Sequence, residues 1–357
     1  MRACFLISRY SFIYFFISLP MLQINDVNMG ITMIKARAHS NIALVKYWGK
    51  KNIALNTPAV GSISLCLEAL YTETGVLFDP LLEKDELLLN GRPATEKERG
   101  RVSSFLDIIR REAGSKQAAR VESVNNFPTA AGLASSASAF AALALAASRA
   151  AGLELSGQEL SILARMGSGS AARSLFGGFV EMHRGRREDG RDAWAEPLYP
   201  ADYWPLQVII AITSEVQKKT GSTDGMELSR RTSPYYRAWV DSSEDDLAAM
   251  RAALAEKDFQ KLAEVSEFSC LKMHALAMAS NPGLIYWSAA TLELLHWVRT
   301  LREQGTPVFF TIDAGPQIKI ICPPSYSSAI VDQLSGHPAV ERTIVSALGP
   351  DARVLGA

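Results

Sequence analysis

Apolar and polar positions along the chain follow two different periods, and segments of the two kinds alternate. Residues 206–213 form an apolar run rich in β-branched side chains, which is typical of a strand. Residues 135–151 are dominated by alanine and end before Gly152, a pattern that favours a helix packed closely against a sheet. Long amphipathic stretches at 244–279 and 289–303 predict further helices. The pattern therefore predicts an α+β or an α/β fold.

Two shorter signals place a helix start and a hairpin. Ser156 and Glu159 have the spacing of a capping box, which predicts that a helix begins there. The apolar runs 308–313 and 318–322 flank the turn sequence Ala-Gly-Pro-Gln, which is typical of a β-hairpin. Asp313 ends the first of these runs, so we expect its side chain at the mouth of the hairpin.

The chain has 357 residues, which is more than a domain with a single hydrophobic core usually contains. We therefore predict an N-terminal domain over residues 33–203 and a C-terminal α+β domain over residues 204–357. Residues 183–192 mix both charges around two glycines, which indicates a solvated loop near the edge of the first domain. Residues 1–32 contain an apolar run at 11–20 that resembles a secretory signal but is too short to span a bilayer and has no cleavage site after it. We expect these first residues to be a disordered extension or to result from an upstream start codon, and genuine export is the alternative.

Charge and cysteine content limit the classes of partner. Lys plus Arg and Asp plus Glu both number 37, so the formal net charge is zero and no global field favours nucleic acid or an anionic membrane. The four cysteines lie far apart without a Cys-x-x-Cys pair, which argues against a zinc site and against a disulfide scaffold. A cytoplasmic protein that holds anionic ligands with local groups is the expectation.

Small and hydroxylated residues fill the segment 126–138, directly before the alanine-rich helix. Gly132 permits a tight turn, and the unpaired amides and dipole of the following helix start favour an anion. Ser135 and Ser136 add hydroxyls for phosphate or Mg²⁺. Glycine and serine also begin helices that bind nothing, but no P-loop or dinucleotide fingerprint occurs elsewhere to compete. The segment therefore indicates a phosphate cradle.

A second loop of small residues, 167–178, places Arg173 among Ser168, Ser170 and Ser174. The planar guanidinium group of arginine matches a carboxylate or a phosphate through two parallel hydrogen bonds. The alternative is a simple turn with an arginine on the surface. We interpret the loop as a grip for an oxyanion.

Charged side chains end two apolar runs. The segment 41–50 begins with apolar residues and ends with Lys46, Tyr47 and Lys50. If the two ammonium groups are buried, they require anionic partners. The alternative is that both lysines extend to water at the end of a strand. Asp313 follows a strongly apolar strand, where a carboxylate is costly unless neighbours stabilise it. A catalytic cleft suits such an acid, and a turn-capping aspartate is the alternative. The combination of the four segments decides between these interpretations.

In this order and at these separations, the segments 41–50, 126–136, 167–178 and 310–316 resemble those of mevalonate diphosphate decarboxylases of the GHMP kinase superfamily. The resemblance extends from about Lys35 to the C-terminal region. It implies a two-lobed, GHMP-kinase-like α+β fold with the active site in the cleft between the lobes, and a homodimer. It also implies ATP-dependent decarboxylation of mevalonate 5-diphosphate to isopentenyl diphosphate, ADP, phosphate and CO₂, through transient phosphorylation of the 3-hydroxyl.

The resemblance assigns roles to individual residues of this chain. Asp313 is expected to take or orient the proton of the 3-hydroxyl, Lys46 to pair with Asp313, and Arg173 to hold the carboxylate that is lost. The substrate and its diphosphate are expected at Tyr47, Lys50, Ser168, Ser170 and, on a looser local match, Arg99. The phosphates of ATP are expected at Ala131, Gly132, Leu133, Ser135 and Ser136, with Mg²⁺ at Ser135.

Three positions depart from the family pattern on the substrate side. Val60 and Gly61 stand where many members have Asn-Ser, and Gly221 stands where serine is usual. These departures leave open which phosphorylated mevalonate binds, so a decarboxylase that acts on mevalonate 5-phosphate is an alternative. A GHMP small-molecule kinase that phosphorylates without decarboxylating is a second alternative, and a non-catalytic ligand sensor is a third.

Overall fold

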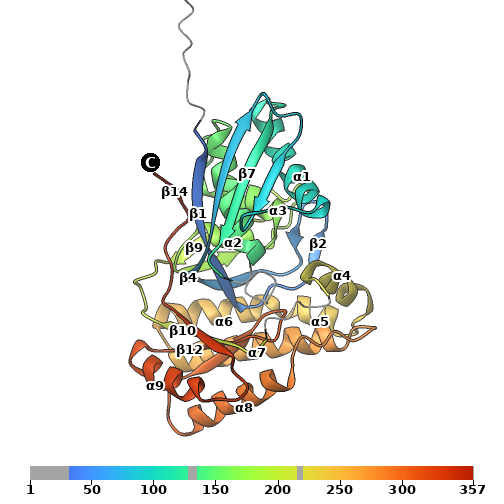
Figure 1. The fold of residues 1–357 in the computed structure, drawn as a ribbon. Coiled ribbons are helices and arrows are strands. Elements are labelled where there is room, and N and C mark those ends of the chain that lie inside the picture. Colours follow the sequence, from blue (N-terminus) through green and yellow to red (C-terminus); the bar gives the residue numbers. More distant parts are fainter. Residues whose placement is uncertain (1–31, 128–134, 215–219, 357) are drawn as a thin grey trace, which may run out of the picture. The chain divides into compact units, whose positions relative to one another are not determined.

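Two β-sheets, with helices around and between them, make up the part of the chain that the computed structural model describes, residues 32–127, 135–214 and 220–356 (Figure 1). The described residues belong to one unit by their mutual contacts. The boundary at residues 203 and 204 stays a prediction, and the expected N-terminal extension lies almost wholly outside the described residues. The mixed composition of sheets and helices confirms the predicted α+β class.

The larger sheet has eight strands in the described residues, in the order β14-β1-β4-β7-β5-β6, with β8 and β9 attached beyond β4. Most neighbouring strands are antiparallel, whereas β5 and β7 are parallel. A separate short hairpin, β2–β3, follows β1 directly. The bounds of these strands are β1 Ile34–Val45, β2 Lys50–Asn52, β3 Thr57–Pro58, β4 Ser62–Asp79, β5 Glu86–Leu89, β6 Arg92–Pro93, β7 Ala118–Asn125, β8 Phe179–Met182, β9 Ala195–Tyr199 and β14 Arg353–Leu355.

Three helices and one 3₁₀ turn pack against this sheet: α1 Glu96–Ala113, α2 Ser135–Ala150, α3 Gly157–Gly167 and η1 Ala171–Leu175. Helix α2 lies directly on β1 and β4, and most of its alanines are fully buried because a methyl group allows this close approach. The hydroxyl of Ser156 accepts from the Glu159 amide at the start of α3, which confirms the predicted capping box. The predicted helix at 135–151 is confirmed to within one residue.

The smaller sheet has the strand order β11-β12-β10-β13 and forms a core with helices α8 and α9. Its strands β11 and β12 are antiparallel, which confirms the predicted hairpin, and β10 confirms the strand predicted at 206–213. The remaining bounds are β10 Gln207–Ile212, α4 Ser222–Thr232, α5 Tyr236–Asp241, α6 Ser243–Glu256, α7 Phe259–Met278, α8 Ala289–Glu303, β11 Phe309–Ile312, β12 Ile318–Cys322, α9 Pro324–Ser335 and β13 Arg342–Ser346.

Helices α6 and α7 lie between the two sheets and join them (Figure 1). Helix α7 packs against β1 of the larger sheet and β11 of the smaller one. The two strands also touch directly, because the Thr311 hydroxyl donates to the Ala43 carbonyl over 3.3 Å. The ends of β1 and β11 therefore meet, although they lie far apart in the sequence. In the described residues, no helix is both long and apolar enough to cross a membrane.

We predict that Ala144→Leu destabilises the fold by about 1–3 kcal/mol, because Ala144 is fully buried and the larger side chain would push α2 away from the sheet. Urea unfolding measures the change. Arg149→Leu is the matched control, since Arg149 is exposed on the last turn of the same helix, and it should change stability by no more than about 0.5 kcal/mol. Equal losses in the two variants would contradict this account of α2.

Candidate active site

An ion pair between Lys46 and Asp313 lies where the two sheets meet. Lys46 follows β1, Asp313 follows β11, and the Lys46 Nζ atom lies 2.6 Å from Asp313 Oδ1. The Lys46 side chain is 1% exposed, whereas that of Asp313 is 24% exposed and so remains accessible from outside. The Lys46 amide donates to the Ser269 hydroxyl of α7 over 2.9 Å. The helix between the sheets therefore fixes the backbone at the point where the lysine leaves β1.

A second lysine approaches the same carboxylate from inside the protein. Lys319 of β12 is fully buried, and its Nζ atom lies 3.4 Å from Asp313 Oδ2. The Oδ2 atom is buried and makes no hydrogen bond within the described residues. Burial alone would raise the pKa of Asp313, but attraction by Lys46 and Lys319 outweighs it and holds this pKa well below its usual range. Asp313 is therefore an anion throughout the neutral pH range.

Two residues of α7 that face this cluster stay uncharged. Burial, with repulsion by Lys46, lowers the pKa of His274 to about 3, so the imidazole is neutral at pH 7. Burial raises the pKa of the Cys270 thiol, which remains protonated. The charges around Asp313 are therefore those of lysine and arginine side chains.

Arg173 is a buried cation whose hydrogen-bond partners in the described part of the chain are neutral. Its side chain donates to Asn41 Oδ1, over 3.3 Å from Nε and 3.1 Å from Nη2, and to the hydroxyl of Ser62. The residue is 2% exposed and forms no ion pair within the described residues. Burial lowers its pKa to about 10, with Asp313 among the charges that act on it, so it is protonated at neutral pH. A buried cation without a counter-ion is suited to an anionic ligand.

The predicted substrate serines lie beside the start of α2. The hydroxyls of Ser168 and Ser170 are 3.4 Å apart, and Ser136 at the first turn of α2 is 3.4 Å from Ser168. The Tyr47 hydroxyl is buried without a hydrogen bond in the described residues and packs on Gly169, where a Cβ atom would lie only 2.4 Å away. Glycine at 169 therefore allows the tyrosine to approach the loop.

Lys50 lies at the start of β2, and polar side chains hold its ammonium group. It donates to Asn56 Oδ1 over 2.6 Å and to the Thr223 hydroxyl over 3.3 Å. Asn56 has a left-handed backbone with φ of 51°, and its amide donates to the Met166 carbonyl over 2.7 Å. Burial, together with the nearby Arg101, lowers the pKa of Lys50.

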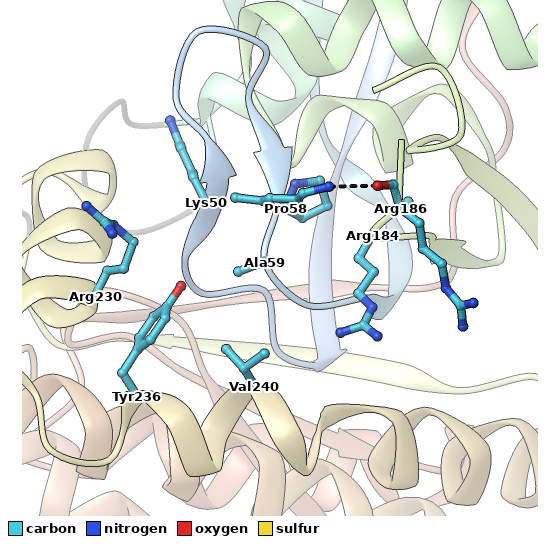
Figure 2. A pocket seen from close by; sticks show the side chains of 10 residues that line it. Lys50, Pro58, Ala59, Arg184, Arg186, Arg230, Tyr236 and Val240 are labelled. Carbon is cyan, nitrogen blue, oxygen red and sulfur yellow. Dashed lines mark hydrogen bonds between the residues drawn. The ribbon is translucent and has the colours of Figure 1, made fainter. Parts of the chain in front are cut away.

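A cavity of about 590 Å³ lies beside Lys50, and Figure 2 shows side chains that line it. Its cationic lining residues are Lys50, Lys51, Arg184, Arg186 and Arg230, but its lining includes neither Asp313 nor Arg173. In Figure 2 the side chain of Lys50 points away from Arg184 and Arg186. Carboxylates pair with three of the other lining cations: Glu188 with Lys51, Glu244 with Arg184 and Glu227 with Arg230. The cavity is therefore not the centre of the Lys46–Asp313 site.

Several predicted positions do not meet at this site or lie outside the described residues. Arg99 donates to Glu96 of the same helix over 2.5 Å, and its role as a substrate contact stays a prediction. Two residues later, Arg101 donates to the Gly167 carbonyl over 3.0 Å and covers the ring of Phe140. Ser135 begins α2 beside the segment of the predicted cradle that the structure leaves undescribed. That segment includes Ala131, Gly132 and Leu133.

Comparison with known proteins shows which family has this arrangement. Residues 38–195 match the family described as diphosphomevalonate decarboxylase-like N-terminal domain, and residues 208–347 match the mevalonate 5-diphosphate decarboxylase C-terminal domain. The chain belongs to the diphosphomevalonate decarboxylase family. The resemblance found in the sequence is thereby confirmed.

Individual members of this family are similar over most of the chain. The diphosphomevalonate decarboxylase of Saccharomyces cerevisiae is 36% identical over 305 residues, which cover 81% of this chain and 77% of the yeast protein. The crystal structure of mevalonate diphosphate decarboxylase from Staphylococcus aureus has 42% identity and a TM-score of 0.86, and covers 90% of this chain and 98% of its own. A structure described as MDDEF in complex with MVAPP, AMPPCP and magnesium has the same values. These likenesses confirm the predicted GHMP-kinase-like fold.

Packing accounts for two of the departures from the family pattern. Val60 is fully buried in an apolar cluster with Trp48, where an asparagine would lack partners. A Cβ atom at Gly61 would lie 2.6 Å from Leu247 Cδ1 of α6 and 3.2 Å from the Met182 carbonyl. The third departure, Gly221, precedes α4 as its N-cap without a side chain to cap the helix.

Sequence reasoning missed four residues that support the site. Lys319 interrupts the apolar run of β12, which is the same signal that drew attention to Lys46. Arg101 lies two residues after Arg99, and its contact with Gly167 of the second loop has no signal in the sequence. Asn41 and Asn56 carry no sequence signal for their roles, since their partners come from distant segments.

We predict that Gly61→Ser destabilises the protein by about 1–3 kcal/mol, because its Cβ atom would collide with the confined side chain of Leu247. Leu247→Ala removes the collision. In a double-mutant cycle followed by urea unfolding, Gly61→Ser should cost at least about 0.5 kcal/mol less in the Leu247→Ala background. Additive losses would show that Leu247 does not select glycine at this position.

Proposed function

We propose that this chain catalyses the ATP-dependent decarboxylation of mevalonate 5-diphosphate to isopentenyl diphosphate, ADP, phosphate and CO₂. Family membership supports the reaction type. The observation that carries the proposal is the ionised Asp313 carboxylate, held between Lys46 and Lys319 and near enough to interact electrostatically with Arg173, a cation that forms no ion pair within the described residues. This pair suits a substrate that has both a hydroxyl and a carboxylate, because Asp313 can bind the hydroxyl and Arg173 can bind the carboxylate.

The residues divide the chemistry between them. Asp313 accepts a hydrogen bond from the 3-hydroxyl and orients its oxygen towards the γ-phosphorus of ATP, where an O–P bond forms and the bond to ADP breaks. The proton passes to Asp313 or onward to solvent. The C3–O bond then breaks, and phosphate leaves with the bonding electrons. Lys46 neutralises charge at this centre.

Arg173 binds the substrate carboxylate through its planar guanidinium group. When the bond between this carboxylate and the neighbouring carbon breaks, its electrons form the alkene and CO₂ departs. Asn41 and Ser62 hold the guanidinium group without neutralising it, so its charge remains available for the substrate. Tyr47, Lys50, Ser168 and Ser170 bind the diphosphate end, and Arg101 adds a cation from α1 near Lys50.

The start of α2 fits the phosphates of ATP and an associated Mg²⁺. The described residues contain no cluster of three His, Cys, Asp or Glu side chains that would hold a metal alone. Mg²⁺ is commonly held by nucleotide phosphates with few protein ligands, and Ser135 and Ser136 supply hydroxyls there. When bound, Mg²⁺ would neutralise phosphate charge during transfer. The related structure in complex with MVAPP, AMPPCP and magnesium supports this ligand set.

We also propose that the protein works in the cytoplasm as a homodimer. Cys66, Cys270 and Cys322 are buried and unpaired in the described residues, which fits a reducing compartment. The homodimer rests on the family resemblance, and light scattering of the purified protein tests it.

Product analysis tests the proposed reaction directly. The protein is incubated with ATP, Mg²⁺ and mevalonate 5-diphosphate, and CO₂, phosphate and isopentenyl diphosphate are measured together. Equal amounts of all three are expected. ADP without free phosphate or alkene would indicate a kinase, and faster turnover of mevalonate 5-phosphate would indicate the monophosphate as substrate.

We predict that Asp313→Asn lowers kcat by about 10²–10⁴-fold, because the neutral amide cannot accept the hydroxyl proton or balance the two lysines. Binding of ATP and mevalonate 5-diphosphate should persist, as measured by calorimetry. Asp246→Asn is a control, since Asp246 pairs with Lys272 between α6 and α7 and should retain turnover. CO₂ release near the wild-type rate in Asp313→Asn would refute the assigned role.

A further inference from the structure

Lys319 is a charged residue in the middle of an apolar strand. All five residues of β12 are buried, and Lys319 pairs with Thr311 of β11 in the sheet register. Its ammonium group donates to the Gln317 carbonyl over 3.3 Å and lies 3.4 Å from Asp313 Oδ2. Burial lowers the pKa of Lys319, while Asp313 acts in the opposite direction. An apolar side chain would suit the strand better, so the lysine needs an explanation beyond packing.

The two oxygens of Asp313 have different surroundings. Oδ1 receives a hydrogen bond from Lys46, whereas Oδ2 is turned into the protein towards Lys319. The side chain as a whole is 24% exposed although Oδ2 is buried, so the accessible part lies away from Lys319. The carboxylate is thus fixed in one orientation, with one lysine at each oxygen.

We propose that Lys319 is a positioning residue that anchors Asp313 Oδ2 inside the protein, so that the carboxylate stays ionised and presents Oδ1 to Lys46 and the substrate. This inference rests on the proposed function and adds a residue to it. Lys319 is fully buried behind Asp313 and acts on the reaction through that carboxylate.

The titratable groups around Asp313 come from three elements, η1, β12 and α7, and from the segment after β1. They are Lys46 after β1, Arg173 in η1 and Lys319 in β12, while Cys270 and His274 of α7 are neutral. Two lysines around one carboxylate leave a surplus of one positive charge. Because these cations favour the ionised carboxylate, Asp313 orients the hydroxyl and passes on any proton that it receives.

The test replaces Lys319 with methionine, which has a similar length and no charge. In Lys319→Met, kcat should fall about tenfold, while KM for mevalonate 5-diphosphate should stay within about twofold, since Lys319 does not touch the substrate. The acid limb of the kcat profile should move upward by about one to three pH units, because loss of a cation raises the pKa of Asp313. Lys319→Gln serves if the methionine variant does not fold.

A double-mutant cycle separates positioning from general stability. In the Asp313→Asn background, Lys319→Met should cause no further loss of kcat, since the carboxylate it positions is gone. Lys272→Met is the matched control: Lys272 lies 2.6 Å from Asp246 in another largely buried ion pair, and its removal should leave both kcat and the pH profile unchanged.

The outcomes are distinct. An additive loss in the Asp313→Asn background, or an unshifted acid limb in Lys319→Met, overturns the positioning role. A wild-type protein that releases no CO₂ from mevalonate 5-diphosphate overturns the proposed function instead, whatever the variants do.

Discussion

The contact between Lys46 and Asp313 is the constraint around which this fold is arranged. A buried charge is costly unless an opposite charge compensates for it, so each of the two residues lowers the cost of burying the other. Their meeting requires β1 and β11 to end at the same point. Helix α7 packs on both strands and binds the Lys46 amide through Ser269, which fixes this junction.

The site gathers positive charge although the chain as a whole is neutral. Lys46 and Lys319 flank a single carboxylate, and Arg173, which interacts with it electrostatically, donates to an amide oxygen and a hydroxyl among the described residues. Neutral partners fix the position of the guanidinium group but do not neutralise its charge. Under the proposed function, this local excess of positive charge binds the anionic groups of the substrate, so the chain needs no net charge to bind a highly charged ligand.

The sequence predicted the main elements because their signals are local. The alanine-rich α2, the capping box of α3 and the β11–β12 hairpin each depend on residues close together in the chain. The Lys46–Asp313 contact was also expected, but only through resemblance to a family. No local pattern links residues that are 267 positions apart.

The missed features depend on packing between distant segments. Arg99 and Arg101 are both cations of α1, and the sequence does not distinguish them. The structure does, because Arg99 pairs with Glu96 of the same helix whereas Arg101 reaches the Gly167 carbonyl. Gly61 departs from the family pattern, and the structure gives a reason: a Cβ atom at this position would collide with Leu247 of α6. The predicted cradle around Gly132 remains a prediction.

The long separation between the ion-paired residues also bears on how the protein forms. Closing a loop of this length is entropically unfavourable and slow compared with forming a helix or a hairpin. During synthesis, the larger sheet can begin to form long before the ribosome has produced β11 and β12. Until those strands dock, Lys46 has no counter-ion, and an incomplete chain would carry an unsatisfied ammonium group at its future active site.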